Sequence, residues 1–178
     1  SMVYSIGETF NIICRTRMNL FIGKNMKQAA KRFFIFYIWG LMLFGVAVGL
    51  ITFLLRNYIT DFYVGSNPKT AGYFVVLLAI YSASIPSEIS ITTTNIGVKT
   101  IGSIWFLLFL NSFCLIGGNL TFGYVASIIY KEGVITLFAW LQIITYFVNL
   151  VCIARVSFTD WTKRELLMED EANASDIP

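Results

Sequence analysis

Four long apolar runs separate the short polar segments of this chain, and they restrict the possible folds more than any other feature. They cover about residues 33–55, 71–96, 101–129 and 134–154. A helix needs about 20 apolar residues to cross the ~30 Å hydrocarbon core of a membrane. Because no water satisfies the backbone there, such a run folds as a helix. The sequence predicts an all-α membrane protein, a polytopic bundle of four transmembrane helices.

The composition agrees with a membrane protein and argues against other classes. Hydrophobic residues make up 57% of the chain and charged residues only 13%, against about 25% charged residues in soluble domains. The net charge of +3 is too small and too dispersed to predict nucleic-acid binding. There is no histidine, and the cysteines show no metal or pairing pattern. We predict no enzyme, no metal site and no cofactor, since no nucleophile–base pair or phosphate-binding glycine loop is present.

The segments around the four runs complete the predicted organisation. Residues 1–23 are expected to be the end of a preceding helix, too polar to span alone, followed by a turn at 23–25. Residues 56–69 are expected to form a polar loop, and 117–119 a weak or bent point of the third run. Residues 158–178 are expected to form an amphipathic segment and an acidic tail, with a tryptophan as an interfacial anchor. Three glycines of the first run predict close helix packing: Gly40, Gly45 and Gly49.

The distribution of positive charge predicts the orientation in the membrane. With four spans, ten lysines and arginines fall on one side and three on the other. The side with more positive charge is expected to be cytoplasmic. The sequence predicts a multi-pass integral membrane protein whose carboxyl terminus is cytoplasmic.

The second run carries an acid near its centre, where a charge costs roughly 3 kcal/mol on insertion scales. Five polar residues recur there at helical spacing, which predicts one polar stripe: Tyr81, Ser84, Glu88, Thr92 and Asn95. Pro86 removes one backbone hydrogen bond and frees the carbonyl of Ser82, so we expect a kink. A kink beside a membrane-buried acid suits a cavity better than a lipid-facing surface. The alternative is that Glu88 is simply hydrogen-bonded inside a helix bundle.

Three segments carry a family resemblance. Residues 16–32 resemble the signature T-R-V-G-N-x-L-G-x-G-N-x-x-x-A-K of the multidrug and toxic compound extrusion (MATE) transporters. Arg17, Gly23, Ala30 and Lys31 match it without gaps. Residues 156–165 resemble the T-D-W-x-K-E that follows the last helix of eukaryotic members, and residues 88–102 are similar to the tenth helix with its E-x(10)-R-G-x-G ending. Glu88 falls on the acidic position of that helix.

The resemblance implies secondary active efflux of small organic cations in exchange for protons or sodium. Residues 1–157 would form part of the second lobe, from the end of the eighth helix through the twelfth. The first lobe would then belong to the same chain or to a partner chain. Glu88 would bind the coupling ion and the substrate in alternation, lined by Tyr81, Ser84, Thr92 and Asn95. The alternative is a polytopic membrane subunit or degenerate half-transporter that acts through a partner and transports nothing.

Overall fold

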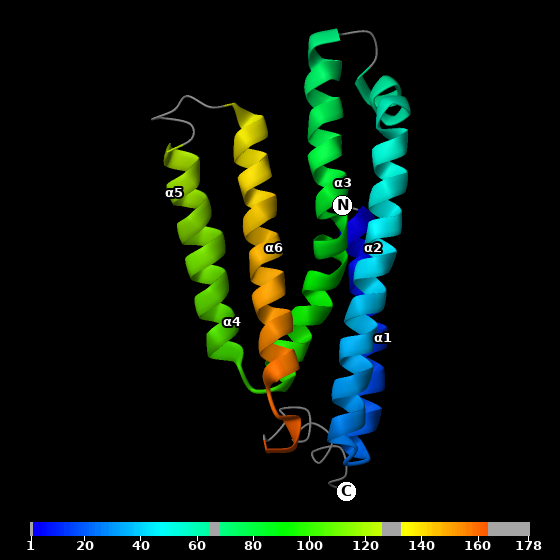
Figure 1. Ribbon diagram of the computed structural model, residues 1–178, viewed down its shortest axis with the longest axis vertical. Helices are drawn as coiled ribbons and strands as arrows, with labels where there is room; N and C mark the ends of the chain where they lie inside the picture. Colours follow the sequence, from blue (N-terminus) through cyan, green and yellow to red (C-terminus); the bar gives the residue numbers. More distant parts are fainter. Residues whose placement is uncertain (1, 65–67, 126–132, 164–178) are drawn as a thin grey trace, which may run out of the picture.

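The computed structural model describes residues 2–64, 68–125 and 133–163, and these are almost entirely helical (Figure 1). The elements in chain order are α1 (Met2–Gly23), α2 (Lys27–Val64), α3 (Pro68–Thr100), α4 (Ile104–Leu110), the π-helix η1 (Asn111–Gly118), α5 (Asn119–Tyr124), α6 (Val134–Phe158) and the short 3₁₀ helix η3 (Trp161–Lys163).

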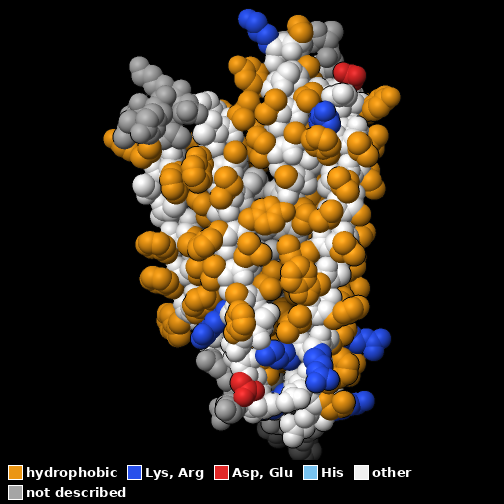
Figure 2. Space-filling view, in the orientation of Figure 1, with side chains coloured by type: hydrophobic (Ala, Val, Ile, Leu, Met, Phe, Trp, Pro, Cys, Tyr) orange, Lys and Arg blue, Asp and Glu red, His pale blue; other side chains and the backbone are white. Residues whose placement is uncertain are grey.

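Four helical stretches are long and apolar enough to cross a membrane: α2, α3, the continuous α4–η1–α5 and α6. The prediction of an all-α bundle with four membrane-spanning helices is therefore confirmed. The predicted leading helix is present as α1. Figure 2 shows apolar side chains over the middle of the molecule and lysines and arginines gathered toward its lower end.

The helices form two groups in Figure 1. One consists of α1, α2 and α3, and the other of α4–η1–α5 and α6. The ribbons of the two groups approach each other at the lower end and diverge toward the upper end. The larger buried apolar cluster joins α1, α2, α3, α4 and α6, with members that include Met18, Phe34, Val98, Leu107 and Val156.

Two helices end in the same way. At the end of α1, Asn25 adopts a positive φ of 55°, and Met26 N donates to the carbonyl of Phe21 at 2.8 Å. At the end of α3, Gly102 has φ 70°, and Ser103 N donates to Val98 O at 3.1 Å. Both are left-handed caps that satisfy the last carbonyls of a helix. The predicted turn at residues 23–25 is confirmed.

The loop predicted at residues 56–69 is wrong over most of its length. α2 continues to Val64, and α3 begins at Pro68, where a proline suits the first helical position. Arg56 Nη1 donates to Phe53 O at 2.8 Å, and Thr60 Oγ1 donates to Arg56 O at 2.7 Å. The side chains of Arg56 and Thr60 thus form hydrogen bonds to backbone carbonyls of α2. The helix therefore extends beyond the end of the apolar run.

The third span also differs from the prediction. It begins at Ile104 rather than at 101, because the cap at Gly102 occupies the preceding residues. The expected irregularity at 117–119 starts earlier, as the π-helix over 111–118. Residues beyond 125 of the predicted span lie outside the described residues.

The segment after α6 packs onto the helices. Trp161, expected as an interfacial anchor, is buried at 1% exposure. Its ring centroid lies 6.1 Å from that of Phe34, and its Nε1 donates to Val156 O at 3.3 Å. Lys31 Nζ donates to Thr159 O at 2.8 Å. The indole finds an apolar partner and an acceptor inside the protein, which explains its burial. The acidic tail predicted from residue 168 lies outside the described residues.

Candidate functional site

The contact between α2 and α3 fixes the orientation of α3. A Cβ built at Gly45 would collide with the Cα of Pro86, and one built at Gly49 would collide with the carbonyl oxygen of Ser82. The two backbones therefore touch, as small residues permit in membrane helices. Gly40 has nothing within 4 Å of such a Cβ, so the packing prediction is confirmed for Gly45 and Gly49 and wrong for Gly40.

Pro86 lies near the middle of α3, and Figure 1 shows this helix changing direction about halfway along its length. A proline in a helix interior frees the carbonyl four residues earlier, here that of Ser82. This carbonyl points at the backbone of Gly49. The predicted bend is present, and the neighbouring helix covers the backbone group that it frees.

Glu88 lies on α3 half a turn beyond Pro86, and its side chain is half-buried. The hydroxyl of Tyr81, seven residues earlier, donates to Glu88 Oε2 at 3.0 Å. Among the described residues, the carboxylate is paired with this hydroxyl and with no lysine or arginine. The structure thus brings together the acid and the tyrosine that the spacing had placed on one face.

The other predicted lining residues behave differently. Ser84 is buried, and its hydroxyl donates to Tyr81 O at 2.7 Å. Such a bond to the preceding turn is common for serine in helices, and it turns Ser84 away from Glu88. Thr92 Oγ1 would lie 3.5 Å from a Cβ built at Gly7 of α1, so this residue faces α1.

Several buried acceptor atoms lie on α1 and α3. The oxygens Thr92 Oγ1, Asn95 Oδ1 and Asn11 Oδ1 are buried without a hydrogen-bond partner among the described residues. Asn11 Nδ2 donates to Glu8 Oε2 at 3.3 Å. Thr92 is therefore a polar group of the α1–α3 contact. Among the described residues, no hydrogen bond joins Thr92 Oγ1 or Asn95 Oδ1 to Glu88.

A hollow of about 320 Å³ does lie at the bend, but it does not include Glu88. Pro86, Ser82, Ala83 and Gly49 line it, together with Tyr146 of α6. The Tyr146 hydroxyl donates to Ala83 O at 2.5 Å. The expectation of a cavity beside the kink is met on one side of α3, while the acid lies on another.

A second polar face of α3 was not predicted from the sequence. Asn149 of α6 is fully buried, and its Nδ2 donates to Ser90 Oγ at 2.7 Å and to Ser87 Oγ at 3.3 Å. Ser90 Oγ in turn donates to Pro86 O at 2.8 Å. Gln142 is also buried, seven residues before Asn149. This spacing of two amides on one face of an apolar helix is the signal that could have revealed the contact.

The architecture defines the protein as a polytopic α-helical membrane protein whose central helix, α3, carries a half-buried acid. No protein-family model matches the chain, and comparison with curated proteins and with solved structures finds no significant match. The resemblance of residues 16–32, 88–102 and 156–165 to MATE transporters therefore stays a prediction from those three segments.

Proposed function

We propose that this chain is part of a secondary active transporter of the MATE type, in which Glu88 exchanges a proton or sodium ion for an organic cation. The observation that carries the proposal is the hydrogen bond from Tyr81 to Glu88 in the bent span α3. An acid within a membrane helix is costly and marks a functional site by default. Pairing it with a neutral hydroxyl leaves its charge to be balanced by a ligand.

The pair of Tyr81 and Glu88 suits two alternating states. A phenol hydroxyl can donate to an ionised carboxylate and can accept from a protonated one. Protonation removes the negative charge that attracts an organic cation, so the two ligands compete for one site. A ligand shifts a conformational equilibrium only through its different affinity for the two states, so the proposal requires the coupling ion and the organic cation to favour different conformations when they bind Glu88.

The rest of the proposal follows from the sequence. The carboxyl terminus is cytoplasmic, the lipid bilayer surrounds the four spans, and a first lobe in the same chain or in a partner chain completes the cavity. Tyr81 lines the site with Glu88. Ser84, Thr92 and Asn95 remain lesser lining candidates; Ser84 donates to the backbone of its own helix, and Thr92 lies beside α1.

The test is efflux of a fluorescent organic cation from proteoliposomes that contain the intact native protein, driven by a pH gradient or by a sodium gradient. Glu88→Gln should abolish efflux under the gradient that drives the wild type. The matched control is Glu8→Gln, which neutralises an acid that is also half-buried but bonded to Asn11 on α1, and it should retain efflux. Normal efflux by a correctly inserted Glu88→Gln variant would remove Glu88 from the site.

The size of the native polypeptide separates the proposal from the non-transporting alternative. An antibody against residues 168–178 should detect a band of more than twice 20.1 kDa if both lobes belong to one chain. A band near that mass, together with no cation flux in the presence of every co-purified chain, would favour the subunit without transport activity.

A further inference from the structure

The seam between the third span and α6 contains two hollows that the Glu88 site does not use. One lies at the basic end of the molecule and includes an arginine, and the other lies further along the same seam and is apolar. We propose that this seam binds one anionic phospholipid, with its phosphate at Arg155 and one acyl chain in the apolar hollow.

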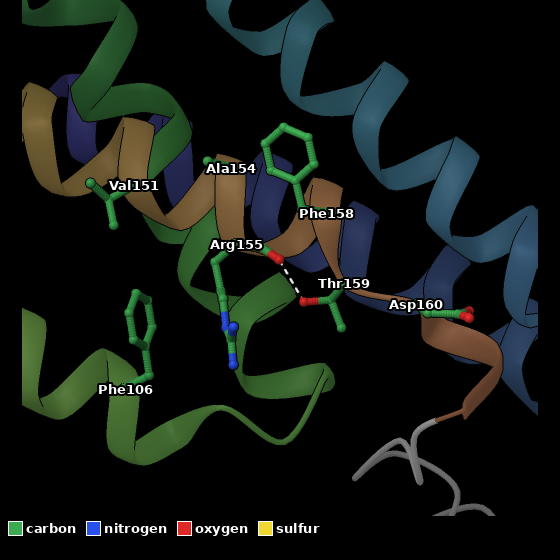
Figure 3. Close-up of a pocket in the computed structure, with 7 residues that line it drawn as sticks. All are labelled: Phe106, Val151, Ala154, Arg155, Phe158, Thr159 and Asp160. Carbon is green, nitrogen blue, oxygen red and sulfur yellow. Dashed lines mark hydrogen bonds between the residues drawn. The ribbon is translucent and has the colours of Figure 1, made fainter.

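The first hollow measures about 580 Å³ and lies between α4 and the end of α6 (Figure 3). The guanidinium carbon of Arg155 lies 5.4 Å from the ring centroid of Phe106. A ring face holds a guanidinium by cation–π attraction and leaves its N–H groups free. The other lining residues are Val151, Ala154, Phe158, Thr159 and Asp160. A planar cation with free donors is the arrangement that binds a phosphate through two parallel hydrogen bonds.

Asp160 lines the same hollow but is engaged elsewhere. Its Oδ1 accepts from Thr162 N at 3.1 Å and from Thr162 Oγ1 at 2.7 Å. Figure 3 shows its carboxylate pointing away from the Arg155 guanidinium. Among the described residues, no acid forms an ion pair with Arg155, so an anion from outside the protein can complete this site.

The second hollow measures about 500 Å³ and lies between η1 and α6. Its walls are almost entirely apolar, and they include Phe113, Phe122, Ile144 and Phe147. Gly117 leaves space in the wall: a Cβ built there would have only Ser112 O within 4 Å, at 3.9 Å. Phe113 and Phe147 are more than half exposed, so the hollow opens onto the surface that faces lipid.

The two hollows lie along one face of α6. Ile144, Phe147, Val151, Ala154 and Phe158 follow one another at steps of three or four residues, which places them in one line on a helix. At 1.5 Å per residue, Phe147 and Ile143 lie about 12 and 18 Å from Arg155 along the axis. Half of the ~30 Å hydrocarbon core is about 15 Å. An acyl chain of one leaflet therefore reaches the apolar hollow when its headgroup lies at Arg155.

The charge of this end favours an anionic lipid over a zwitterionic one. Lysines and arginines gather at the lower end in Figure 2, and Lys99 and Arg155 are both exposed there. Each basic residue near a membrane surface attracts anionic lipid by about 1 kcal/mol. A choline headgroup carries its own cation, which these residues repel.

The test is native mass spectrometry of the full chain in detergent micelles with long-chain phosphatidylglycerol. Arg155→Gln should weaken binding of the first lipid about fivefold, the equivalent of ~1 kcal/mol for one basic residue. The matched control is Arg56→Gln, which removes another guanidinium stacked on a ring, 4.1 Å from the Phe53 centroid. Arg56 lies on the far half of α2, so its loss should leave binding unchanged.

A second pair of variants tests the acyl chain. Gly117→Leu should fill the apolar hollow and weaken binding of long-chain phosphatidylglycerol, while dihexanoyl phosphatidylglycerol, whose chains are too short to reach it, should bind as to the wild type. Gly72→Leu is the control, because Gly72 of α3 is exposed with nothing within 4 Å of its Cβ position. Arg155→Lys keeps the positive charge but loses the planar guanidinium. Its affinity for the lipid should lie between those of Arg155→Gln and the wild type.

The results that overturn the proposal are specific. Displacement of the lipid by inorganic phosphate at equal concentration would show a free-anion site. Equal losses in Arg155→Gln and Arg56→Gln would show diffuse attraction, and equal binding of phosphatidylcholine would remove the role of charge. Each variant is required to keep the wild-type elution volume and helicity. The readout is bound mass, so the result is independent of whether the protein transports.

Discussion

Two polar faces of the same helix differ in where their hydrogen bonds go. On the α6 side of α3, Asn149 and Tyr146 donate across to the groups of Ser87, Ser90 and Ala83. On the other side, the hydrogen bond of Glu88 comes from Tyr81 of the same helix. Hydrogen bonds between two helices stabilise their packing against each other. A hydrogen bond within one helix does not contribute to that packing. The comparison separates polar residues that join two helices from an acid whose hydrogen bond comes from its own helix.

The largest effect is expected where α2 holds α3 in its orientation. Gly45→Leu should destabilise the protein by about 3 kcal/mol or more, because the new side chain overlaps the Pro86 backbone and cannot be accommodated by a side-chain shift. Both polar faces of α3 would be displaced together. Unfolding in mixed micelles with increasing dodecyl sulfate, followed by circular dichroism, measures the change.

The matched control for that variant is Gly40→Leu, one turn and a residue earlier on α2. Gly40 is exposed with nothing within 4 Å of its Cβ position, so the stability should change by less than ~0.5 kcal/mol. Equal destabilisation by the two substitutions would show that α2 and α3 are not in close contact at Gly45.

The next largest effect concerns the α6 face. Asn149→Leu should lower the free energy of unfolding by about 1–2 kcal/mol, since it removes donors to Ser87 and Ser90 and leaves their oxygens buried. The same denaturation experiment measures the loss. Cation efflux by the folded fraction should stay close to that of the wild type. A stability equal to the wild type would show that this amide does not hold the two helices together.

The sequence predicts the number and class of the helices well, because hydropathy reports directly on the lipid environment. It predicts their ends less well. Hydropathy marks only the part of a helix that lies in the apolar layer. α2 continues nine residues beyond the predicted apolar run, to Val64, because Thr60 and Arg56 form hydrogen bonds to the helix backbone. The left-handed cap at Asn25 falls in a turn that the sequence predicts, whereas the cap at Gly102 was missed, so the start of the third span was placed three residues too early.

The candidate site was predicted in part. Helical spacing correctly joined Tyr81 to Glu88, because residues seven apart lie on one face. It did not show that the Ser84 hydroxyl bonds to the backbone of its own helix. Nor did it show that Thr92 lies beside Gly7 of α1. Spacing along one helix says which residues share a face, whereas the neighbour that covers that face is set by tertiary packing.

A smaller effect is expected for a single hydroxyl on the α6 face. Tyr146→Phe should lower the free energy of unfolding by about 0.5–1 kcal/mol, because the carbonyl of Ala83 loses its donor at the bend of α3. Thermal unfolding in detergent is sensitive enough to detect it. An unchanged midpoint would indicate that water or another donor replaces the hydroxyl in the hollow at the bend.

The smallest effect on stability is expected on the Glu88 face. There the loss of one tyrosine hydroxyl can be compared directly with the same loss on the α6 face. Tyr81→Phe removes the same hydroxyl group as Tyr146→Phe, but from a bond within one helix. Its free energy of unfolding should change by less than ~0.5 kcal/mol, while the dependence of cation efflux on pH should shift, because the carboxylate loses its hydroxyl donor. Efflux by the intact protein across a series of pH values, measured for both variants, tests this. If Tyr81→Phe destabilises the protein as much as Tyr146→Phe and leaves the pH profile unchanged, then both faces serve packing and Glu88 is a structural acid.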